Sequence, residues 1–219
     1  MATIAFDFDS TLVRCETLEV LVAPQLSGDD AKADAYRRIT DAGMSGGRSF
    51  AESLEARLAV AAPTLQQLRA FSGELDGLWT PGMPELVRTL IGEGHEVWIV
   101  SGAPAEVIMD AGAALGVPAS QTRGVGLNWE SDGRFRSVDP EDPFSRSKVE
   151  GLKGLTDPWT RPRIMVGDGL TDRTVFDEGL VDRFIPFTGH VRREVVVRGG
   201  IPEASSATDV MNLIRTYSR

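Results

Sequence analysis

Short apolar runs alternate with stretches of helical periodicity along most of the chain. Thr3–Phe8, Glu96–Val100 and Ile164–Val166 are short apolar runs, as expected for parallel strands that are buried on both faces. Pro104–Leu115 and Leu170–Asp177 follow the second and third runs and have apolar residues at helical spacing. This alternation predicts an α/β fold with a doubly wound, mostly parallel, Rossmann-like sheet.

Weaker signals predict the remaining elements of this α/β core. Asp132-Gly133 lies between Arg123–Trp129 and Arg134–Val138, an arrangement typical of a β-hairpin. Further helices are predicted over residues 83–91, 147–155 and 209–217, and a short strand over residues 183–186.

The chain from Glu16 to about Gly77 has a different pattern. Apolar residues such as Phe50, Leu54 and Leu58 recur there at helical spacing, and short Gly, Ser and Pro breaks separate the groups. We predict a helical-bundle cap, without a strand of its own, inserted after the first strand. The predicted division is an α/β core over residues 1–13 and 79–219 and a cap over residues 14–78.

Composition and charge narrow the function classes. Of the 219 residues, 42% are hydrophobic and 25% are charged, which is typical of a folded globular protein. The net charge of −9, without a run of Lys or Arg, argues against a nucleic acid or a membrane as partner. There is no basic leader, no apolar stretch near the ~20 residues of a spanning helix, and only one cysteine, Cys15. We therefore expect a soluble cytoplasmic protein.

Unusual polar residues follow the three predicted strands. Asp7 and Asp9 follow the first strand, Ser101-Gly102 the second and Asp168 the third. The carboxyl ends of parallel strands meet at one edge of such a sheet, where ligands bind. Asp7 and Asp9 could hold a hard cation, and one of them could attack phosphorus while the other acts as general acid and base. The alternative is a loop rich in helix-capping residues.

The other polar residues also have two interpretations each. Ser101 and Gly102 could hold phosphate oxygens, or they could form an ordinary strand-to-helix turn. Lys148 lies in the first turn of a predicted helix, where a cation opposes the helix dipole, so it could neutralise a phosphate or simply be an exposed lysine. Asp168 could complete a metal site with Asp172 supporting it, or both could belong to a Gly-rich turn.

Taken together, these motifs resemble those of the haloacid dehalogenase superfamily of aspartate-nucleophile phosphatases. The resemblance covers nearly the whole chain, because the helical insert lies where this superfamily has its cap. Within the superfamily, the run Asp7-Phe8-Asp9-Ser10-Thr11-Leu12-Val13, followed closely by Glu16, is most similar to that of phosphoserine phosphatases.

The resemblance implies a role for each matching position. Asp7 would be the nucleophile and a metal ligand, and Asp9 would be the general acid and base and would bind the metal through its backbone carbonyl. Asp168 would be the third ligand, supported by Asp172, and the metal would be Mg²⁺. Lys148 would pair with the phosphate and with the nucleophile. The other residues implied in phosphate binding are Thr11, Ser101 and Gly102.

The resemblance also implies a substrate. Glu16 would contact the ammonium group of O-phospho-L-serine, and Arg57 would contact its carboxylate. Phe50 lies seven residues before Arg57 and hence on the same helix face. Alternatively, Phe50 belongs to the core, and Arg57 only packs its stem along the apolar stripe of Leu54 and Leu58. Glu16 could then be an acidic residue in the first turn of a helix. The remaining residues implied in substrate binding are Met44, Gly46 and Thr171. Departures from the family pattern at Ala103-Pro104 and Phe187–His190 leave the substrate open.

We therefore predict a Mg²⁺-dependent phosphoric monoester hydrolase. It would convert O-phospho-L-serine into L-serine and phosphate through a phosphoaspartate, as in serine biosynthesis. One alternative is a phosphatase of another small phosphorylated metabolite, such as an amino-alcohol, sugar or thiosugar phosphate. The other is a non-catalytic module that binds a phosphorylated ligand. A monomer or a homodimer is expected.

Overall fold

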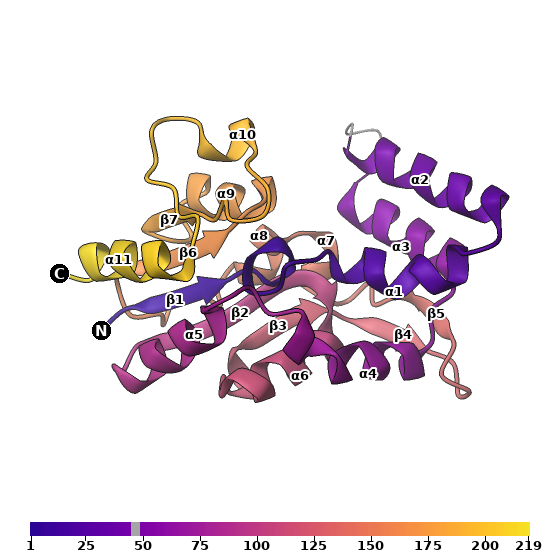
Figure 1. Ribbon diagram of the computed structural model, residues 1–219, viewed down its shortest axis with the longest axis horizontal. Helices are drawn as coiled ribbons and strands as arrows, with labels where there is room; N and C mark the ends of the chain where they lie inside the picture. Colours follow the sequence, from indigo (N-terminus) through magenta and orange to yellow (C-terminus); the bar gives the residue numbers. More distant parts are fainter. Residues whose placement is uncertain (45–48) are drawn as a thin grey trace.

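A five-stranded parallel sheet forms the centre of the molecule (Figure 1). The computed structural model describes residues 1–44 and 49–219, without the side chain of Met44. The sheet has the order β3-β2-β1-β6-β7, so the strand order reverses beside β1, where ligands bind in such folds. The predicted doubly wound sheet is confirmed. Its strands are β1 (Thr3–Phe6), β2 (Glu96–Pro104), β3 (Thr122–Val125), β6 (Arg163–Gly167) and β7 (Arg183–Pro186).

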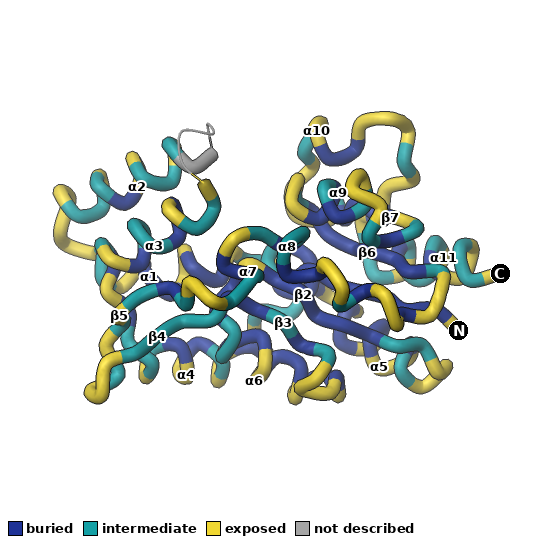
Figure 2. Tube along the Cα trace, turned by 180° about the vertical axis from the view of Figure 1, so that it is seen from behind, coloured by how far each residue is buried: buried dark blue, intermediate teal, exposed yellow. Residues whose placement is uncertain are grey.

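Side chains of the strands alternate between two apolar layers. Ile4 and Phe6 of β1 pack in one layer with helices α5, α6 and α11, whereas Ala5 packs in the other layer with α8 and α9. All three residues are fully buried, and Figure 2 shows the same for most of the sheet. Helices therefore cover both faces of the sheet. Their bounds are α5 (Met83–Gly92), α6 (Ala105–Leu115), α8 (Lys148–Leu152), α9 (Leu170–Asp177) and α11 (Ala207–Tyr217).

The insert after β1 is helical, as predicted. It contains α1 (Thr17–Leu26), α2 (Asp30–Met44), α3 (Phe50–Ala61) and α4 (Leu65–Gly73). Helices α1 to α3 share an apolar cluster of their own, but α4 packs against α6 and contributes to the main core. The chain enters and leaves the insert side by side, since the Arg14 amide donates to the Leu78 carbonyl at 2.9 Å. The domain boundaries at residues 14 and 78 stay a prediction.

The predicted hairpin is shorter than expected. Its strands are β4 (Leu127–Trp129) and β5 (Phe135–Val138), whereas residues 122–125 form β3 of the main sheet. The prediction of one strand over Arg123–Trp129 is therefore wrong. At Gly126 the backbone amide donates to the Asp142 carboxylate at 2.6 Å, which separates the two strands. Strand β5 packs against α3, so the hairpin joins the cap cluster.

Other differences concern the lengths of elements. The helix predicted over residues 147–155 is the five-residue α8, and β2 extends to Pro104 instead of ending at Val100. Two short helices, α7 (Pro143–Arg146) and α10 (Glu194–Val197), were not predicted, nor were the turns η1 (Phe8–Leu12), η2 (Leu75–Gly77) and η3 (Ala119–Gln121). Among the described residues, no helix has the length and apolar character needed to cross a membrane.

Candidate active site

A cavity of about 500 Å³ lies between the sheet and the cap. The core lines it with the loops that follow β1 and β6 and with the end of β2, and the cap lines it with α1, α2 and α3. Most of the predicted site residues meet there. They are Asp7, Asp9, Glu16, Phe50, Arg57, Ser101, Gly102, Lys148, Asp168 and Thr171.

The turn that follows β1 carries Asp7 and Asp9. The Asp7 amide donates to the Val166 carbonyl at 2.8 Å, which continues the pairing of β1 with β6. Ser10 then adopts φ +51°, a left-handed conformation that is unfavourable for a residue with a side chain. It is held there because its hydroxyl donates to Glu16 at 2.7 Å. This irregular turn brings both aspartates to the cavity.

Asp9 is held by the first residue of α1. The Thr17 amide donates to Asp9 Oδ1 at 3.0 Å, and the Thr17 hydroxyl donates to the same oxygen. Burial and the charges of Glu16 and Asp7 raise the pKa of Asp9 well above its ordinary value, although the bonds from Thr17 oppose this. A carboxyl group with a raised pKa holds its proton more readily than an exposed aspartate, a property that a general acid needs. Sequence reasoning missed Thr17, whose only signal is its place at a helix start.

Lys148 bridges two buried carboxylates. Its Nζ lies 2.9 Å from Asp7 Oδ1 and also contacts Asp172 Oδ1. Burial alone would lower the pKa of Lys148, but the charges of Asp172 and Asp7 outweigh it, so the pKa lies above its ordinary value. Lys148 is 7% exposed, and Asp172 is fully buried and accepts from the Gly169 amide at 3.0 Å. The alternative of a solvent-exposed lysine is therefore wrong.

Asp168 follows β6 and pairs with an arginine that sequence reasoning missed. Arg193 Nη1 donates to Asp168 Oδ2 and, at 3.2 Å, to the Asp168 carbonyl. Burial and the charge of Asp7 raise the pKa of Asp168 to about 6, although Arg193 opposes this. Arg193 lies directly before α10 and lines the cavity. The only sequence signal for it was the unusual loop around His190.

The carboxylates of the site fit a hard divalent cation. Asp7, Asp168 and Asp172 each offer an oxygen atom within 4.8 Å of the others, and all three residues are buried. An all-oxygen, anionic donor set suits Mg²⁺ better than a softer metal. Both oxygen atoms of Asp172 are engaged, Oδ1 with Lys148 and Oδ2 with the Gly169 amide, whereas Lys148 contacts only Oδ1 of Asp7 and Arg193 only Oδ2 of Asp168. The carboxylates of Asp7 and Asp168 are therefore the better candidates for direct ligands.

The predicted phosphate-binding residues lie in two environments. Ser101 Oγ accepts from the Ala103 amide at 3.1 Å, and its own proton has no acceptor among the described residues. Gly102 lies under the ring of Phe50, since a Cβ atom at Gly102 would be 3.1 Å from Phe50 Cζ. Thr11 does not line the cavity, and its buried hydroxyl has no hydrogen-bond partner among the described residues. Its role in phosphate binding stays a prediction.

The cap residues are placed as follows. Arg57 Nε donates to the Ser53 carbonyl at 3.4 Å, and its Nη1 lies 3.9 Å from Glu19 Oε1. Met44 ends α2, and Gly46 lies outside the described residues. Their predicted contacts with the substrate therefore stay predictions.

His190 does not line the cavity. Its Nε2 lies 2.8 Å from Thr80 Oγ1, and its ring packs edge-on against Phe187. These contacts tie the loop after β7 to the start of the segment that leads into α5.

Comparison with known proteins agrees with this geometry. The profile of the haloacid dehalogenase-like hydrolases matches residues 4–177. A phosphoserine phosphatase of Homo sapiens is 30% identical over 88% of this chain and 84% of its own length. The chloroplastic phosphoserine phosphatase of Arabidopsis thaliana is 28% identical over 88% of this chain and 65% of its own length.

Solved structures share the fold. A phosphoserine phosphohydrolase-like protein from Francisella tularensis superposes with a TM-score of 0.88 at 35% identity, covering 98% of this chain and 100% of its own. A structure described as a phospho-aspartyl intermediate analogue of phosphoserine phosphatase gives a TM-score of 0.73 at 22% identity, covering 98% of both chains. The chain therefore belongs to the haloacid dehalogenase-like hydrolase family and is a phosphoric monoester hydrolase, as predicted.

Proposed function

We propose that the chain is a Mg²⁺-dependent phosphatase that hydrolyses O-phospho-L-serine to L-serine and phosphate through a phosphoaspartate on Asp7. The main support is the meeting of two sets of residues in one cavity. One set, with Asp7, Asp9 and Lys148, suits phosphoryl transfer, and the other, with Glu16 and Arg57, suits an amino acid. The relatives named phosphoserine phosphatase support the substrate. A cytoplasmic location and a role in serine biosynthesis belong to the same proposal.

The first step transfers the phosphoryl group to the enzyme. A carboxylate oxygen of Asp7 attacks phosphorus, and the bond from phosphorus to the serine oxygen breaks. Lys148, with its Nζ 2.9 Å from Asp7 Oδ1, balances the negative charge that gathers on the nucleophile and the phosphate. Asp7, Asp168 and the Asp9 carbonyl would hold a Mg²⁺ ion, which would supply further positive charge for the phosphate.

Asp9 handles the proton in both steps. The Asp9 carboxyl group, whose pKa is raised, gives its proton to the departing serine oxygen. Thr17 binds only Oδ1, and Oδ2 makes no hydrogen bond within the described part of the chain, so Oδ2 is the atom that would donate. The resulting carboxylate then takes a proton from the water that attacks the phosphoaspartate. Phosphate leaves, and Asp7 is restored.

The cavity also fits a small zwitterion. Arg57 offers a guanidinium group for the substrate carboxylate, and Glu16 offers a carboxylate for its ammonium group. Phe50 covers Gly102 from the cap side, and Thr171 lines the same cavity from the first turn of α9. A volume of about 500 Å³ is within the range of small-molecule sites.

A phosphatase of another small phosphorylated metabolite is the second candidate. Two observations favour it. The Arg57 guanidinium is already near Glu19 and bonded to the Ser53 carbonyl, and the turn after Ser101 continues with Ala103-Pro104. A panel of amino-alcohol, sugar and thiosugar phosphates, ranked by kcat/KM against O-phospho-L-serine, separates the two candidates.

The test is phosphate release from O-phospho-L-serine with Mg²⁺ and with a chelator. We expect turnover only with Mg²⁺, and a loss on the order of 10³-fold or more in Asp7→Asn, which removes the nucleophile. Asp110→Asn is the control, because this substitution removes the same charge at a residue that is exposed on α6. Release from an aryl phosphate but not from O-phospho-L-serine would disprove the substrate and leave the chemistry standing.

A further inference from the structure

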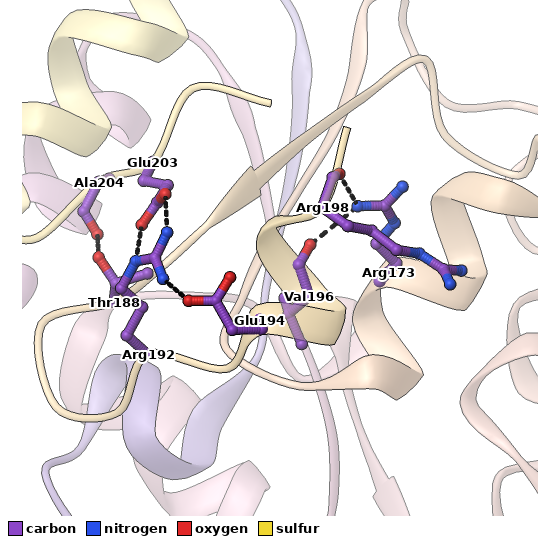
Figure 3. A network of polar contacts seen from close by, with 8 residues as sticks. All are labelled: Arg173, Thr188, Arg192, Glu194, Val196, Arg198, Glu203 and Ala204. Carbon is purple, nitrogen blue, oxygen red and sulfur yellow. Dashed lines mark hydrogen bonds and ion pairs between the residues drawn. The ribbon is translucent and has the colours of Figure 1, made fainter. Parts of the chain in front are cut away.

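The segment from Thr188 to Ala204, here called the strap, follows the carboxyl end of β7 and is anchored at its two ends. The Thr188 amide donates to the Ala204 carbonyl at 2.8 Å. Arg192 binds Glu203 through two hydrogen bonds of 2.9 and 2.8 Å and also contacts Glu194 (Figure 3). These contacts close the strap into a loop with a fixed base.

A buried arginine anchors the middle of the strap. Arg173 is 8% exposed, and its Nη1 donates to the carbonyls of Val196 and Arg198 at 2.9 and 2.6 Å (Figure 3). Arg173 follows Asp172 on α9, the helix that begins beside Asp168. The strap is therefore fixed to the same helix that supports the carboxylate cluster.

Between these anchors, the strap presents Arg193 to the cavity. Its guanidinium binds Oδ2 of Asp168, one of the two oxygen atoms of a carboxylate that could hold the divalent cation. A cation close to a metal site opposes binding of the metal through charge repulsion, and the oxygen atom that it occupies is not free for the ion. At the same time, a buried carboxylate without a counter-charge is unfavourable, so Asp168 needs a partner when the ion is absent.

We propose that Arg193 is a built-in competitor of the divalent cation. It neutralises Asp168 in the metal-free enzyme, and its contact with Oδ2 breaks when the ion binds. This inference rests on the metal dependence in the proposed function. The Arg193 side chain is 36% exposed while it contacts Asp168. Because the anchors hold the strap in place, this side chain stays beside the cavity after its release. The affinity for the ion is therefore lower than the aspartates alone would provide.

Titration with MgCl₂ alone, followed by calorimetry at constant ionic strength, tests the proposal without a substrate. We expect Arg193→Gln to lower the dissociation constant of Mg²⁺ about tenfold, within the usual range for coupled binding events. Arg193→Lys keeps the charge and should stay close to the wild type. Arg198→Gln is the matched control, because it removes the same charge from the strap at a side chain that is 62% exposed and lies near Asp177 instead of Asp168.

Thermal unfolding gives an independent readout. Without metal, Arg193→Gln leaves Asp168 unpaired, so its Tm should fall below that of Arg198→Gln. Saturating Mg²⁺ should remove this difference. Equal Mg²⁺ affinity in Arg193→Gln and the wild type, or equal affinity in Arg193→Gln and Arg193→Lys, would overturn the proposal. Absence of Mg²⁺ binding in every variant would instead overturn the metal dependence on which it rests.

Discussion

The acidic and basic side chains of the site are buried, and each contacts a specific partner. Asp7 pairs with Lys148, Asp168 pairs with Arg193, and Asp9 is held by hydrogen bonds from Thr17. Taking a charge out of water is unfavourable by several kcal/mol unless a partner compensates, so each group depends on its neighbour. The stability of this region and its chemistry therefore rest on the same contacts.

Lys148→Met separates these two contributions. The variant leaves Asp7 and Asp172 buried without their cation, which should lower the free energy of unfolding by about 3–5 kcal/mol and abolish turnover. In the double variant Lys148→Met/Asp172→Asn, one of the two unpaired charges is gone. Denaturant unfolding should then recover part of the loss, while phosphate release stays absent. Equal stability of the single variant and the wild type would contradict this account.

Cys15 gives a pH-dependent readout beside the site. Burial and the charges of Asp9 and Glu16 raise the pKa of its thiol to about 11, so the unreactive neutral form dominates at pH 8. Alkylation of the native protein by iodoacetamide should therefore rise with a midpoint near pH 11. Asp9→Asn should shift the midpoint down, because it removes a charge that opposes the thiolate, and Asp110→Asn should not. A midpoint near the ordinary value of about 8.5 would contradict the prediction.

Among the elements, the short helices α7 and α8 position Lys148. Ser147 caps α8 by accepting from the Glu150 amide at 3.0 Å, and Lys148 is the first residue of the helix. Gly151 faces the ring of Phe144 on α7, where a Cβ atom would come within 2.4 Å of the ring. The two helices can pack this closely only because residue 151 has no side chain.

Gly151→Ala should therefore push α8 away from α7. We expect a loss of about 1–3 kcal/mol in the free energy of unfolding, as for other overpacked sites, and slower phosphate release because Lys148 moves with the helix. Gly73→Ala is the control, since Gly73 ends α4 with no atom within 4 Å of the added Cβ. Thermal unfolding of both variants measures the difference. Similar Tm values for the two variants would show that the ring of Phe144 yields without loss.

The same elements show how far the sequence predicts the structure. Leu170–Asp177 and Arg183–Pro186 have the predicted bounds, because glycines, carboxylates and apolar runs mark their ends locally. The break at Gly126 was missed, because the apolar pattern continues through it and only the distant Asp142 side chain reveals it. Arg193 was missed for a similar reason, since its importance depends on contact with Asp168, 25 residues earlier in the chain.

In the whole molecule, the apolar cluster of α1 to α3 does not coincide with the inserted segment. It includes residues of the hairpin, which lies outside the insert, and it excludes α4, which lies inside it. The hairpin β4–β5 packs with α1 to α3, and the Val138 amide donates to Glu55 of α3 at 2.6 Å. Helix α4, although part of the insert, packs with α6 in the main core. Figure 1 shows the hairpin beside α1 and α3, at the end of the sheet opposite to the two termini.

Hydrogen exchange of the native protein should follow this packing. We expect the amides of α1 to α3 and of the hairpin to open together, and those of α4 to open with α6, because cooperative units follow shared apolar clusters. Glu55→Ala should weaken protection in the hairpin, while Glu55→Gln, which keeps an acceptor for the Val138 amide, should retain most of it. Exchange of α4 together with α1 to α3 would contradict this division.

The strand order has a consequence for synthesis on the ribosome. β1 is made first but lies in the middle of the sheet, between β2 and β6. Its partner β6 ends at Gly167, whereas β2 is complete at Pro104. At ordinary elongation rates, one edge of β1 therefore stays unpaired for roughly 3 to 12 seconds after β2 has been made. Asp7 cannot reach Lys148 and Asp168 in their final positions before that pairing closes. During this interval the nascent chain is therefore inactive and most prone to associate with other chains.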